Sequence, residues 1–287
     1  MLDKQKPASG PQQNEQNRQG RGFEAEREVQ EVEEHSRLRA PLIYEIVRHE
    51  GQTEMQRPAT SLWWSGVAAG LSISFSLLAQ AILHLHLPDA GWRPLVTGFG
   101  YPVGFLMVVL ARQQLFTENT VTVVLPVAAE FTWRNVRGLL RMWAIVFAAN
   151  MVGTLFAAMF CNFAPVVSPE LRATMLELSR QAMTPGVIEM FFRAISAGFL
   201  IAAMVWLIPS AEGTQFHVVT VMTYLIAIGS FQHIVAGSVE AFLLVAHGEL
   251  GVGAMLGGFT LPVLLGNVVG GTALFALISY AQVMHEM

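Results

Sequence analysis

The side chains with the clearest chemical potential in this sequence are a glutamine and a histidine inside an apolar stretch. Gln232 and His233 lie in AIGSFQHIVAGS, residues 227–238. A titratable side chain inside a membrane span is costly, so such groups usually face a cavity or a partner and mark the path of a solute. With an unperturbed pKa of about 6.5, an imidazole can donate a hydrogen bond or a proton near neutral pH. The alternative is a purely structural histidine that bonds to backbone carbonyls freed by a helix break.

A second polar interruption and a repeated motif indicate that the chain contains two related halves. The interruption is ARQQLFTENT, residues 111–120, and the motif Asn-x-Val-Gly begins at Asn150 and again at Asn267, 117 positions later. At the same offset, Leu115-Phe116-Thr117 falls on Gln232-His233-Ile234. Because both features share one spacing, the sequence predicts an internal repeat in which the two interruptions correspond.

The elements that must position these residues are membrane-spanning helices. Hydrophobic residues make up 53% of the 287 residues, charged residues only 13%, and the mean hydropathy is +0.47, which is typical of a membrane protein. A net charge of −4 gives no support for nucleic-acid binding. Residues 1–57 are expected to form a polar cytoplasmic extension with a short amphipathic helix near residues 41–50, stopped by Gly51. Residues 58–287 are expected to form the membrane domain.

We predict six spans in an all-α membrane domain. The second and fifth are too long for unbroken perpendicular helices, so we expect breaks at residues 112–120 and around His233. Three spans in each half give the halves opposite orientations, which is the inverted 3+3 repeat of many transport proteins, with both breaks near the midplane. The expected spans cover residues 62–87, 94–126, 139–163, 187–208, 216–245 and 252–281.

The spans carry no residue pattern typical of an enzyme. We find no paired carboxylates, metal-ligand cluster or nucleophile–base spacing, so we expect no catalytic residues, no cofactor and no metal. Two histidines and an aspartate at His84, His86 and Asp89 are interpreted as an exposed loop rather than a metal site. Glu189 and Arg193 are four residues apart at the start of the fourth span and are expected to form an ion pair along the helix.

Three motifs over residues 62–281 resemble the formate/nitrite transporter family: QLFTENT at residues 114–120, GSFQHIVAGS at residues 229–238 and LGNVVGG at residues 265–271. The chain is identified as a divergent member. The resemblance implies an aquaporin-like six-helix protomer with its own pore and a homopentamer. It also implies a bacterial inner membrane location, with both termini cytoplasmic.

The resemblance also implies which residues line the pore. Leu115, Phe116, Thr117 and His233 would meet at its centre, and Tyr101, Phe105 and Ile226 would narrow it. The chain departs from the family at Gln232, where relatives have glutamate, at Gly198, where they have asparagine, and near Ala182, where they have lysine.

These observations lead to one functional hypothesis and one alternative. The hypothesis is a channel or transporter for a small monovalent anion or its conjugate weak acid, with proton exchange at His233. The alternative is a membrane protein that keeps the fold but transports another substrate, or acts in assembly or regulation without transporting. The identity of the solute and the choice between channel and proton-coupled transport stay open at this stage.

Overall fold

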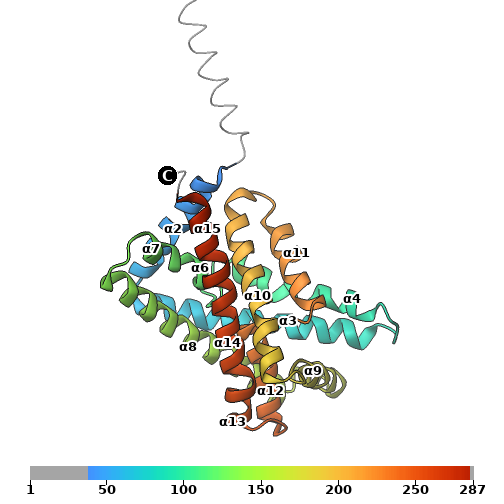
Figure 1. Ribbon diagram of the computed structural model, residues 1–287. Coiled ribbons are helices and arrows are strands. Elements are labelled where there is room, and N and C mark those ends of the chain that lie inside the picture. The colour runs from blue at the N-terminus through green and yellow to red at the C-terminus, as the bar shows by residue number, and fades with distance from the viewer. Residues whose placement is uncertain (1–37, 285–287) are drawn as a thin grey trace, which may run out of the picture. The chain divides into compact units, whose positions relative to one another are not determined.

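The computed structural model describes residues 38–284, and these residues fold into helices joined by short connections. No strand occurs in this part of the chain. Residues 1–37 of the predicted polar extension lie outside the described residues. The all-α prediction is therefore confirmed for the membrane domain (Figure 1).

Among the described residues, five helical segments are long and apolar enough to cross a membrane. They are Ala59–His86 (α3), Arg93–Leu110 (α4, η1 and α5), Trp133–Phe163 (α8), Val187–Ser210 (α10 and η2) and Val252–Val283 (α13, η3, α14, η4 and α15). Their outer faces carry large exposed apolar side chains, including Trp64, Phe156 and Phe192 at 69, 62 and 63% exposed. A surface with so many large apolar side chains is unfavourable in water, and together with the apolar spans it shows that the chain is an integral membrane protein.

The predicted second and fifth spans are both broken into shorter helices. The second span consists of α4 (Arg93–Thr97), η1 (Gly98–Gly100) and α5 (Pro102–Leu110), a non-helical segment, then α6 (Asn119–Thr122) and α7 (Val124–Ala129). The fifth span consists of α11 (Gln215–Ile228) and α12 (Ile234–His247). The breaks lie where polar side chains interrupt the apolar runs, as the sequence predicts.

The two breaks begin with the same backbone turn. After α5, the N–H of Gln113 donates to the carbonyl of Val108 (2.9 Å), and after α11 the N–H of Phe231 donates to the carbonyl of Ile226 (3.0 Å). The residue before each donor adopts the left-handed conformation that ends many helices, with φ of 52° at Arg112 and 50° at Ser230. Neither is glycine, so each turn carries some backbone strain. The two turns lie 118 residues apart.

The amphipathic helix near residues 41–50 is longer than expected. Helix α2 spans Ala40–Gln56 and passes through Gly51, which does not end it. A Cβ atom at Gly51 would lie 1.8 Å from the carbonyl oxygen of Thr122, so the glycine permits close contact between α2 and α6. The prediction of a stop was wrong because a packing glycine and a helix-ending glycine look alike in a sequence.

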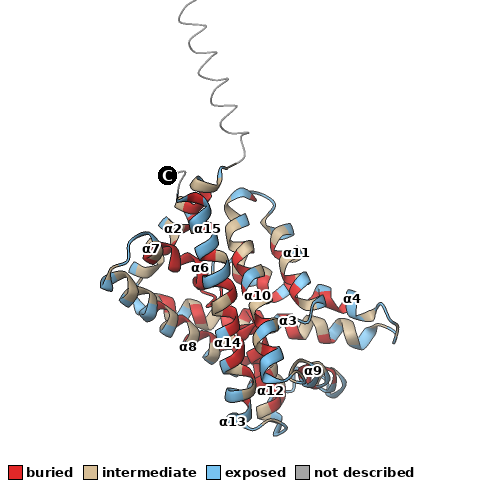
Figure 2. Cartoon of the chain, in the orientation of Figure 1, coloured by how far each residue is buried: buried red, intermediate tan, exposed pale blue. Residues whose placement is uncertain are grey.

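Helix pairs in each half approach closely at glycines. A Cβ atom at Gly153 of α8 would lie 2.3 Å from the carbonyl oxygen of Val67 of α3. A Cβ atom at Gly270 of η4 (Val269–Ala276) would lie 2.1 Å from the carbonyl oxygen of Ile195 of α10. Small residues at such crossings let membrane helices pack backbone to backbone. Buried residues concentrate along these facing surfaces (Figure 2).

The remaining helices lie at the two ends of the membrane domain. The segment after the third span contains α9 (Pro169–Ala182). At the other end, α2 packs against α15 (Leu277–Val283), and the rings of Tyr44 and Tyr280 are 5.9 Å apart. The first and last helices of the described domain therefore lie on one side (Figure 1).

Candidate functional site

The first break is held by one buried asparagine. Asn150 of α8 is 0% exposed, and its Oδ1 accepts a hydrogen bond from the N–H of Phe116 (2.9 Å). Its Nδ2 donates to the carbonyls of Gly66 (2.8 Å) and Gln114 (2.9 Å). A non-helical backbone at membrane depth needs protein partners for its polar groups, and this side chain supplies them to both sides of Leu115.

The second break is held in the same way by Asn267 of α14 (Leu261–Val268), which is also 0% exposed. Its Oδ1 accepts from the N–H of Ile234 (2.8 Å), and its Nδ2 donates to the carbonyls of Ala194 (2.8 Å) and Gln232 (2.9 Å). Each of the three contacts has a counterpart at Asn150.

The matching contacts refine the spacing that the sequence indicates. The asparagines are 117 residues apart, but their partners in the breaks are 118 apart, since Phe116 matches Ile234. Their partners in the first helix of each half, Gly66 and Ala194, are 128 apart. The offset changes because the connecting segments of the two halves differ in length.

Thr117 and His233 bring the two breaks together. The Thr117 hydroxyl oxygen lies 2.7 Å from Nε2 of His233, and the two residues are 0 and 1% exposed. His233 is also the N-cap of α12, because its Nδ1 accepts the N–H of Ala236 (3.2 Å). With Nδ1 occupied as an acceptor, the neutral ring carries its proton on Nε2 and donates it to Thr117. His233 therefore has a structural role as a helix cap, but it bonds to a backbone N–H and a hydroxyl rather than to freed carbonyls.

Two aromatic residues pack against this pair. The ring of Phe105 meets the imidazole of His233 edge to face, with centroids 5.0 Å apart, and Tyr101 lies 5.1 Å from Phe105. Phe105 is fully buried. The predicted narrowing residues from α5 and its N-cap are thus brought next to the histidine.

A cavity of about 190 Å³ lies on one side of the pair, beside α9; we call it the α9-side cavity. It includes four of the predicted site residues, Tyr101, Ile226, Gln232 and His233. Gln232 points away from the histidine, because its Nε2 donates to the carbonyl of Ala182 (3.1 Å). Ala182, near which the resemblance to the family implies a lysine, therefore contributes a backbone oxygen to Gln232.

Two charged side chains in this cavity, Arg193 and Glu240, were not among the predicted pore residues. Arg193 forms the predicted ion pair with Glu189 (2.6 Å) and also donates to the carbonyl of Ser230 (3.3 Å). Glu240 lies seven residues after His233 on α12. A glutamate two turns from the histidine inside an apolar span is a signal that could have identified it.

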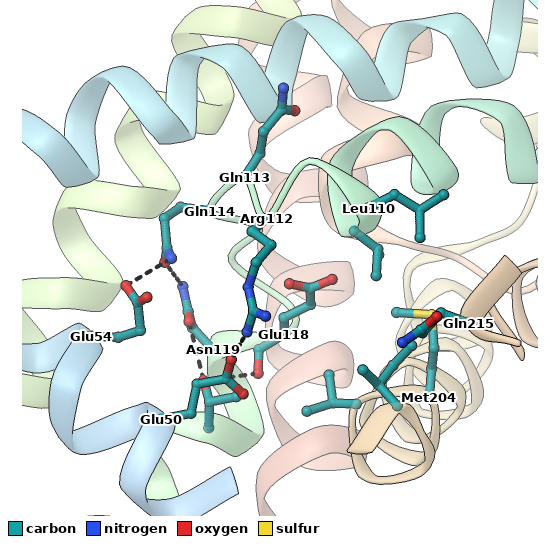
Figure 3. A pocket seen from close by; sticks show the side chains of 14 residues that line it. Glu50, Glu54, Leu110, Arg112, Gln113, Gln114, Glu118, Asn119, Met204 and Gln215 are labelled. Carbon is teal, nitrogen blue, oxygen red and sulfur yellow. Dashed lines mark hydrogen bonds and ion pairs between the residues drawn. The ribbon is translucent and has the colours of Figure 1, made fainter. Parts of the chain in front are cut away.

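A second cavity, of about 340 Å³, lies beside α2; we call it the α2-side cavity (Figure 3). Three glutamates line it, Glu50, Glu54 and Glu118, together with Arg112. Arg112 forms an ion pair with Glu50 across the opening. Since Gln114 and Glu118 flank Leu115–Thr117 and line this cavity, while His233 lines the other, the Thr117–His233 pair lies between the two.

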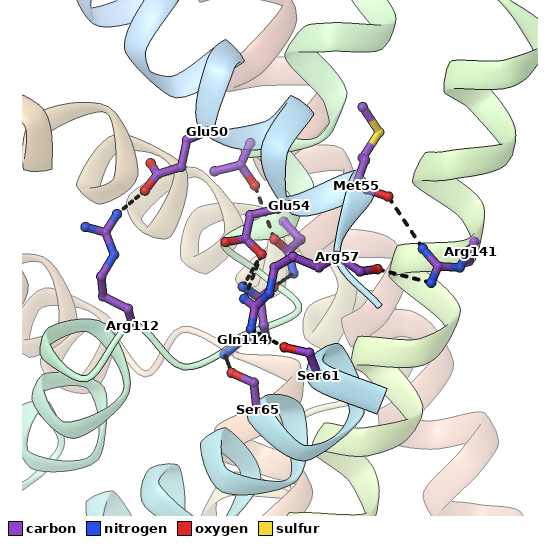
Figure 4. Close-up of polar contacts among 11 residues, drawn as sticks. Glu50, Glu54, Met55, Arg57, Ser61, Ser65, Arg112, Gln114 and Arg141 are labelled. Carbon is purple, nitrogen blue, oxygen red and sulfur yellow. Dashed lines mark hydrogen bonds and ion pairs between the residues drawn. The ribbon is translucent and has the colours of Figure 1, made fainter. Parts of the chain in front are cut away.

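Helix α2 is bonded to the first break through a short polar chain (Figure 4). The Nε2 of Gln114 donates to Glu54 (2.9 Å), and its Oε1 accepts from Asn119 (3.1 Å). The backbone N–H of Gln114 donates to Ser65 of α3 (3.1 Å). These bonds hold Gln114, the residue that precedes the Leu-Phe-Thr segment, in place.

Leu115 and Phe116 are placed differently from their neighbour Thr117. Both are buried, and neither lines the two cavities. The Phe116 ring packs against Trp143 and Phe147 of α8, with centroids 5.7 and 5.1 Å away. These side chains anchor the first break to the helix that carries Asn150.

Gly198 is a packing position. A Cβ atom there would lie 2.4 Å from the carbonyl oxygen and 2.8 Å from the Cα of Asn267. Gly70 has the corresponding place in the first half, since a Cβ atom there would lie 2.4 Å from the carbonyl oxygen of Asn150. An asparagine at Gly198 would require α10 and α14 to move apart.

Two further contacts between titratable groups involve the last turns of α3 and α9. His84 belongs to α3 and lies 4.0 Å from Glu177, and the described residues contain no cluster of three or more possible metal ligands. Arg180 of α9 donates two hydrogen bonds to Glu249 (2.6 and 2.7 Å). These bonds lower the pKa of the Glu249 carboxyl below its usual range, because they stabilise the carboxylate.

Comparisons with known proteins relate the whole membrane domain to one family. Residues 41–281 match the family described as formate/nitrite transporter. The inner membrane protein YfdC of Escherichia coli K12 is 44% identical over 249 residues, which cover 87% of this chain and 80% of that protein. The formate channel FocA of Haemophilus influenzae is 27% identical over 243 residues, covering 75% of this chain and 84% of that protein.

Solved structures show the same fold. A pentameric formate channel with formate bound superposes with a TM-score of 0.68 at 18% identity, covering 79% of this chain and 98% of that one. An ion channel described as a member of the FNT family gives a TM-score of 0.71 at 20% identity, covering 84% and 98%. The match over residues 41–281 and the 44% identity to YfdC lead to one conclusion: the chain belongs to the formate/nitrite transporter family.

Proposed function

We propose that this chain forms a membrane channel or transporter for a small monovalent anion or its conjugate weak acid. The observation that carries the proposal is the bond between Thr117 and His233, which joins two broken helices between two cavities. Broken helices that meet inside the membrane are typical of solute sites in transport proteins. The names of the relatives, which include a formate channel, agree with this solute class.

In this proposal the six spans form an aquaporin-like protomer with an inverted repeat. The matched contacts of Asn150 and Asn267 and the matched turns at Arg112 and Ser230 support it. We further propose a homopentamer, because one of the structural relatives is a pentameric channel. We also propose a bacterial inner membrane location with both termini cytoplasmic; the packing of α15 on α2 places both ends of the described domain on one side.

The solute crosses the narrow region as a neutral acid. Fully buried apolar side chains at Phe105 and Ile226 lie next to His233 or in the cavity that it lines. Moving a bare anion through such surroundings costs several kcal/mol or more. Proton exchange at His233 removes that charge, and the Thr117 hydroxyl offers a polar contact while the solute passes.

The geometry sets a condition on this exchange. The neutral imidazole has one N–H, on Nε2, and losing it would leave an anionic ring. His233 must therefore gain a proton before it gives one to the solute. The proton source must reach the ring from a cavity that the ring lines, which in this structure is the α9-side cavity.

Uptake into proteoliposomes tests the proposal. We would measure a panel of small weak acids, including formate and nitrite, with the native protein, His233→Ala and Thr117→Ala. Thr223→Ala is the matched control, because Thr223 is equally buried but bonds only to a carbonyl of its own helix, that of Val219 (2.7 Å). We expect saturable uptake of at least one acid, reduced by both site variants and unchanged in the control.

Two outcomes contradict the proposal. Native rates and native pH dependence in both site variants would remove Thr117 and His233 from the solute path. Absence of uptake across the panel by the native protein would favour the alternative, in which the fold is kept for another substrate or for an assembly or regulatory role.

A further inference from the structure

Glu240 brings a carboxyl group into the α9-side cavity. It lies on α12 seven residues after His233, and both side chains line the cavity together with Tyr101. His233 caps the helix, and Glu240 lies about two turns further along it. The Oε2 atom lies 3.7 Å from the position that a Cβ atom would take on Gly237. The side chain therefore reaches back over Gly237, toward the end of α12 that His233 caps.

This carboxyl group has no fixed partner. Within residues 38–284, no hydrogen bond or ion pair engages it. Arg193, the cation of the same cavity, is bonded to Glu189 and to the carbonyl of Ser230. Carboxylates in apolar surroundings are normally paired, so an unpaired one facing a cavity in a span is a candidate for function rather than for stability.

The other groups in the cavity are poor proton carriers. The titratable or charged side chains that face Glu240 there are Tyr101, Arg193 and His233. Helices α3 and α9, which also pack against α12, contribute only neutral side chains, such as Gln80 and Gln181. Near neutral pH a tyrosine stays protonated and an arginine stays charged, so Glu240 and His233 are the two groups that can exchange protons.

We propose that Glu240 carries protons between the water of the α9-side cavity and His233, and is the counter-charge of the protonated ring. This inference rests on the proposed function, because it supplies the proton source that His233 needs. Gln232, the chain neighbour of His233, cannot replace it, since its amide does not titrate and is bonded to Ala182.

Each proton transfer is balanced. The O–H bond of the Glu240 carboxyl breaks, and water in the α9-side cavity relays the proton to Nδ1 of His233, the ring nitrogen that carries none. The new N–H bond displaces the hydrogen bond from Ala236 and leaves a carboxylate and an imidazolium. The Nδ1–H bond then breaks as an O–H bond forms on the anionic solute, which continues as a neutral acid, and the ring again accepts from Ala236. The carboxylate regains a proton from hydronium in the cavity. An opposite charge nearby favours the protonated ring, so the carboxylate also stabilises the intermediate state.

Formate uptake and proton movement, measured together in proteoliposomes, test this assignment. The variant Glu240→Gln keeps the size of the side chain and removes its acid. The control Glu130→Gln changes an exposed glutamate that lines neither cavity. We expect native and control proteins to move one proton with each formate, at a rate that rises as the pH falls and then levels off. Glu240→Gln should reduce the rate at least about tenfold at pH 7, the lower range of a lost general acid, without levelling off.

A second measurement uses the native protein and so does not depend on how the variant folds. An apolar carbodiimide reacts with protonated carboxyl groups, and mass spectrometry locates the adduct. We expect modification of Glu240, slower modification in the presence of formate, and loss of uptake in proportion to the adduct.

The outcomes separate this inference from the function on which it rests. Native uptake with a native pH profile in Glu240→Gln overturns the inference and leaves the proposed function in place. Full uptake after complete modification of Glu240 does the same. Absence of formate uptake by the native protein, with no other solute of the panel transported, overturns both.

Discussion

Replacing Asn267 with alanine should destabilise the protein strongly, because its side chain supplies the hydrogen-bond partners of the backbone at the second break. The substitution removes the acceptor for the N–H of Ile234 and the donor for the carbonyl of Gln232. The N–H is in the first turn of α12 and has no partner within its helix, and the carbonyl is in the non-helical segment. The third partner, the carbonyl of Ala194, is inside α10 and keeps its helical bond.

The size of the effect follows from the number of groups left without partners. A buried backbone group that loses its hydrogen bond costs about 1–3 kcal/mol. Two such groups give about 2–6 kcal/mol, before any contribution from the space left by the amide. Asn150→Ala should cost a similar amount, since it frees the N–H of Phe116 and the carbonyl of Gln114 in the same way.

Reversible unfolding in mixed detergent micelles, followed by circular dichroism, measures this free energy. Thr223→Val is the matched control, because Thr223 is fully buried and bonds only to a carbonyl that its own helix already satisfies. We expect the control to cost less than about 1 kcal/mol, the net value of an ordinary hydrogen bond. An alanine variant at Asn267 that is no less stable than the control would refute the role assigned to the amide.

Three further predictions follow from other features. Ser230→Gly should raise the unfolding free energy by about 1 kcal/mol, as measured by the same titration, because φ at Ser230 is 50° and glycine adopts this conformation without strain. Gly198→Ala should lower the unfolding free energy by about 1–3 kcal/mol, the usual cost of overpacking, because the new Cβ atom would press on the backbone of Asn267. An unchanged midpoint of the unfolding titration would contradict the packing role. The Arg180–Glu249 pair should stabilise the native protein above the normal carboxyl pKa of about 4.3, and this contribution should disappear as the pH falls through the lowered pKa of Glu249. Thermal midpoints at neutral and acidic pH should therefore differ more in the native protein than in Arg180→Gln.

The sequence predicts both breaks and five of the six expected spans, because these depend on composition and length. The fifth expected span consists of two helices that are each too short to count as a span. An apolar run longer than a bilayer is thick must break or tilt, and the polar residues show where. The shared spacing of the two halves predicts that the two breaks face each other, and the resemblance to the family implies that Thr117 meets His233. The functional roles of the predicted site residues stay predictions.

Other features depend on contacts between distant segments, and the sequence does not reveal them. Gly51 resembles a helix stop, and only the nearby backbone of Thr122 explains why a glycine lies within α2. Gly198 resembles the loss of a polar residue, yet it lies where two helix backbones touch. Glu240 belongs to no motif; its place in an apolar span is a signal, but only the cavity shows that it shares a space with His233.

The two asparagines also constrain how the chain is made. Phe116 is bonded to Asn150, 34 residues later, and Ile234 is bonded to Asn267, 33 residues later. At synthesis rates of about 5–20 residues per second, about 2–7 seconds pass between the synthesis of each break and the synthesis of the asparagine that bonds to it. During that time its polar backbone needs water or the insertion machinery as a partner, because lipid offers none. Each half of the protein is therefore expected to enter the bilayer as a three-helix unit rather than one helix at a time.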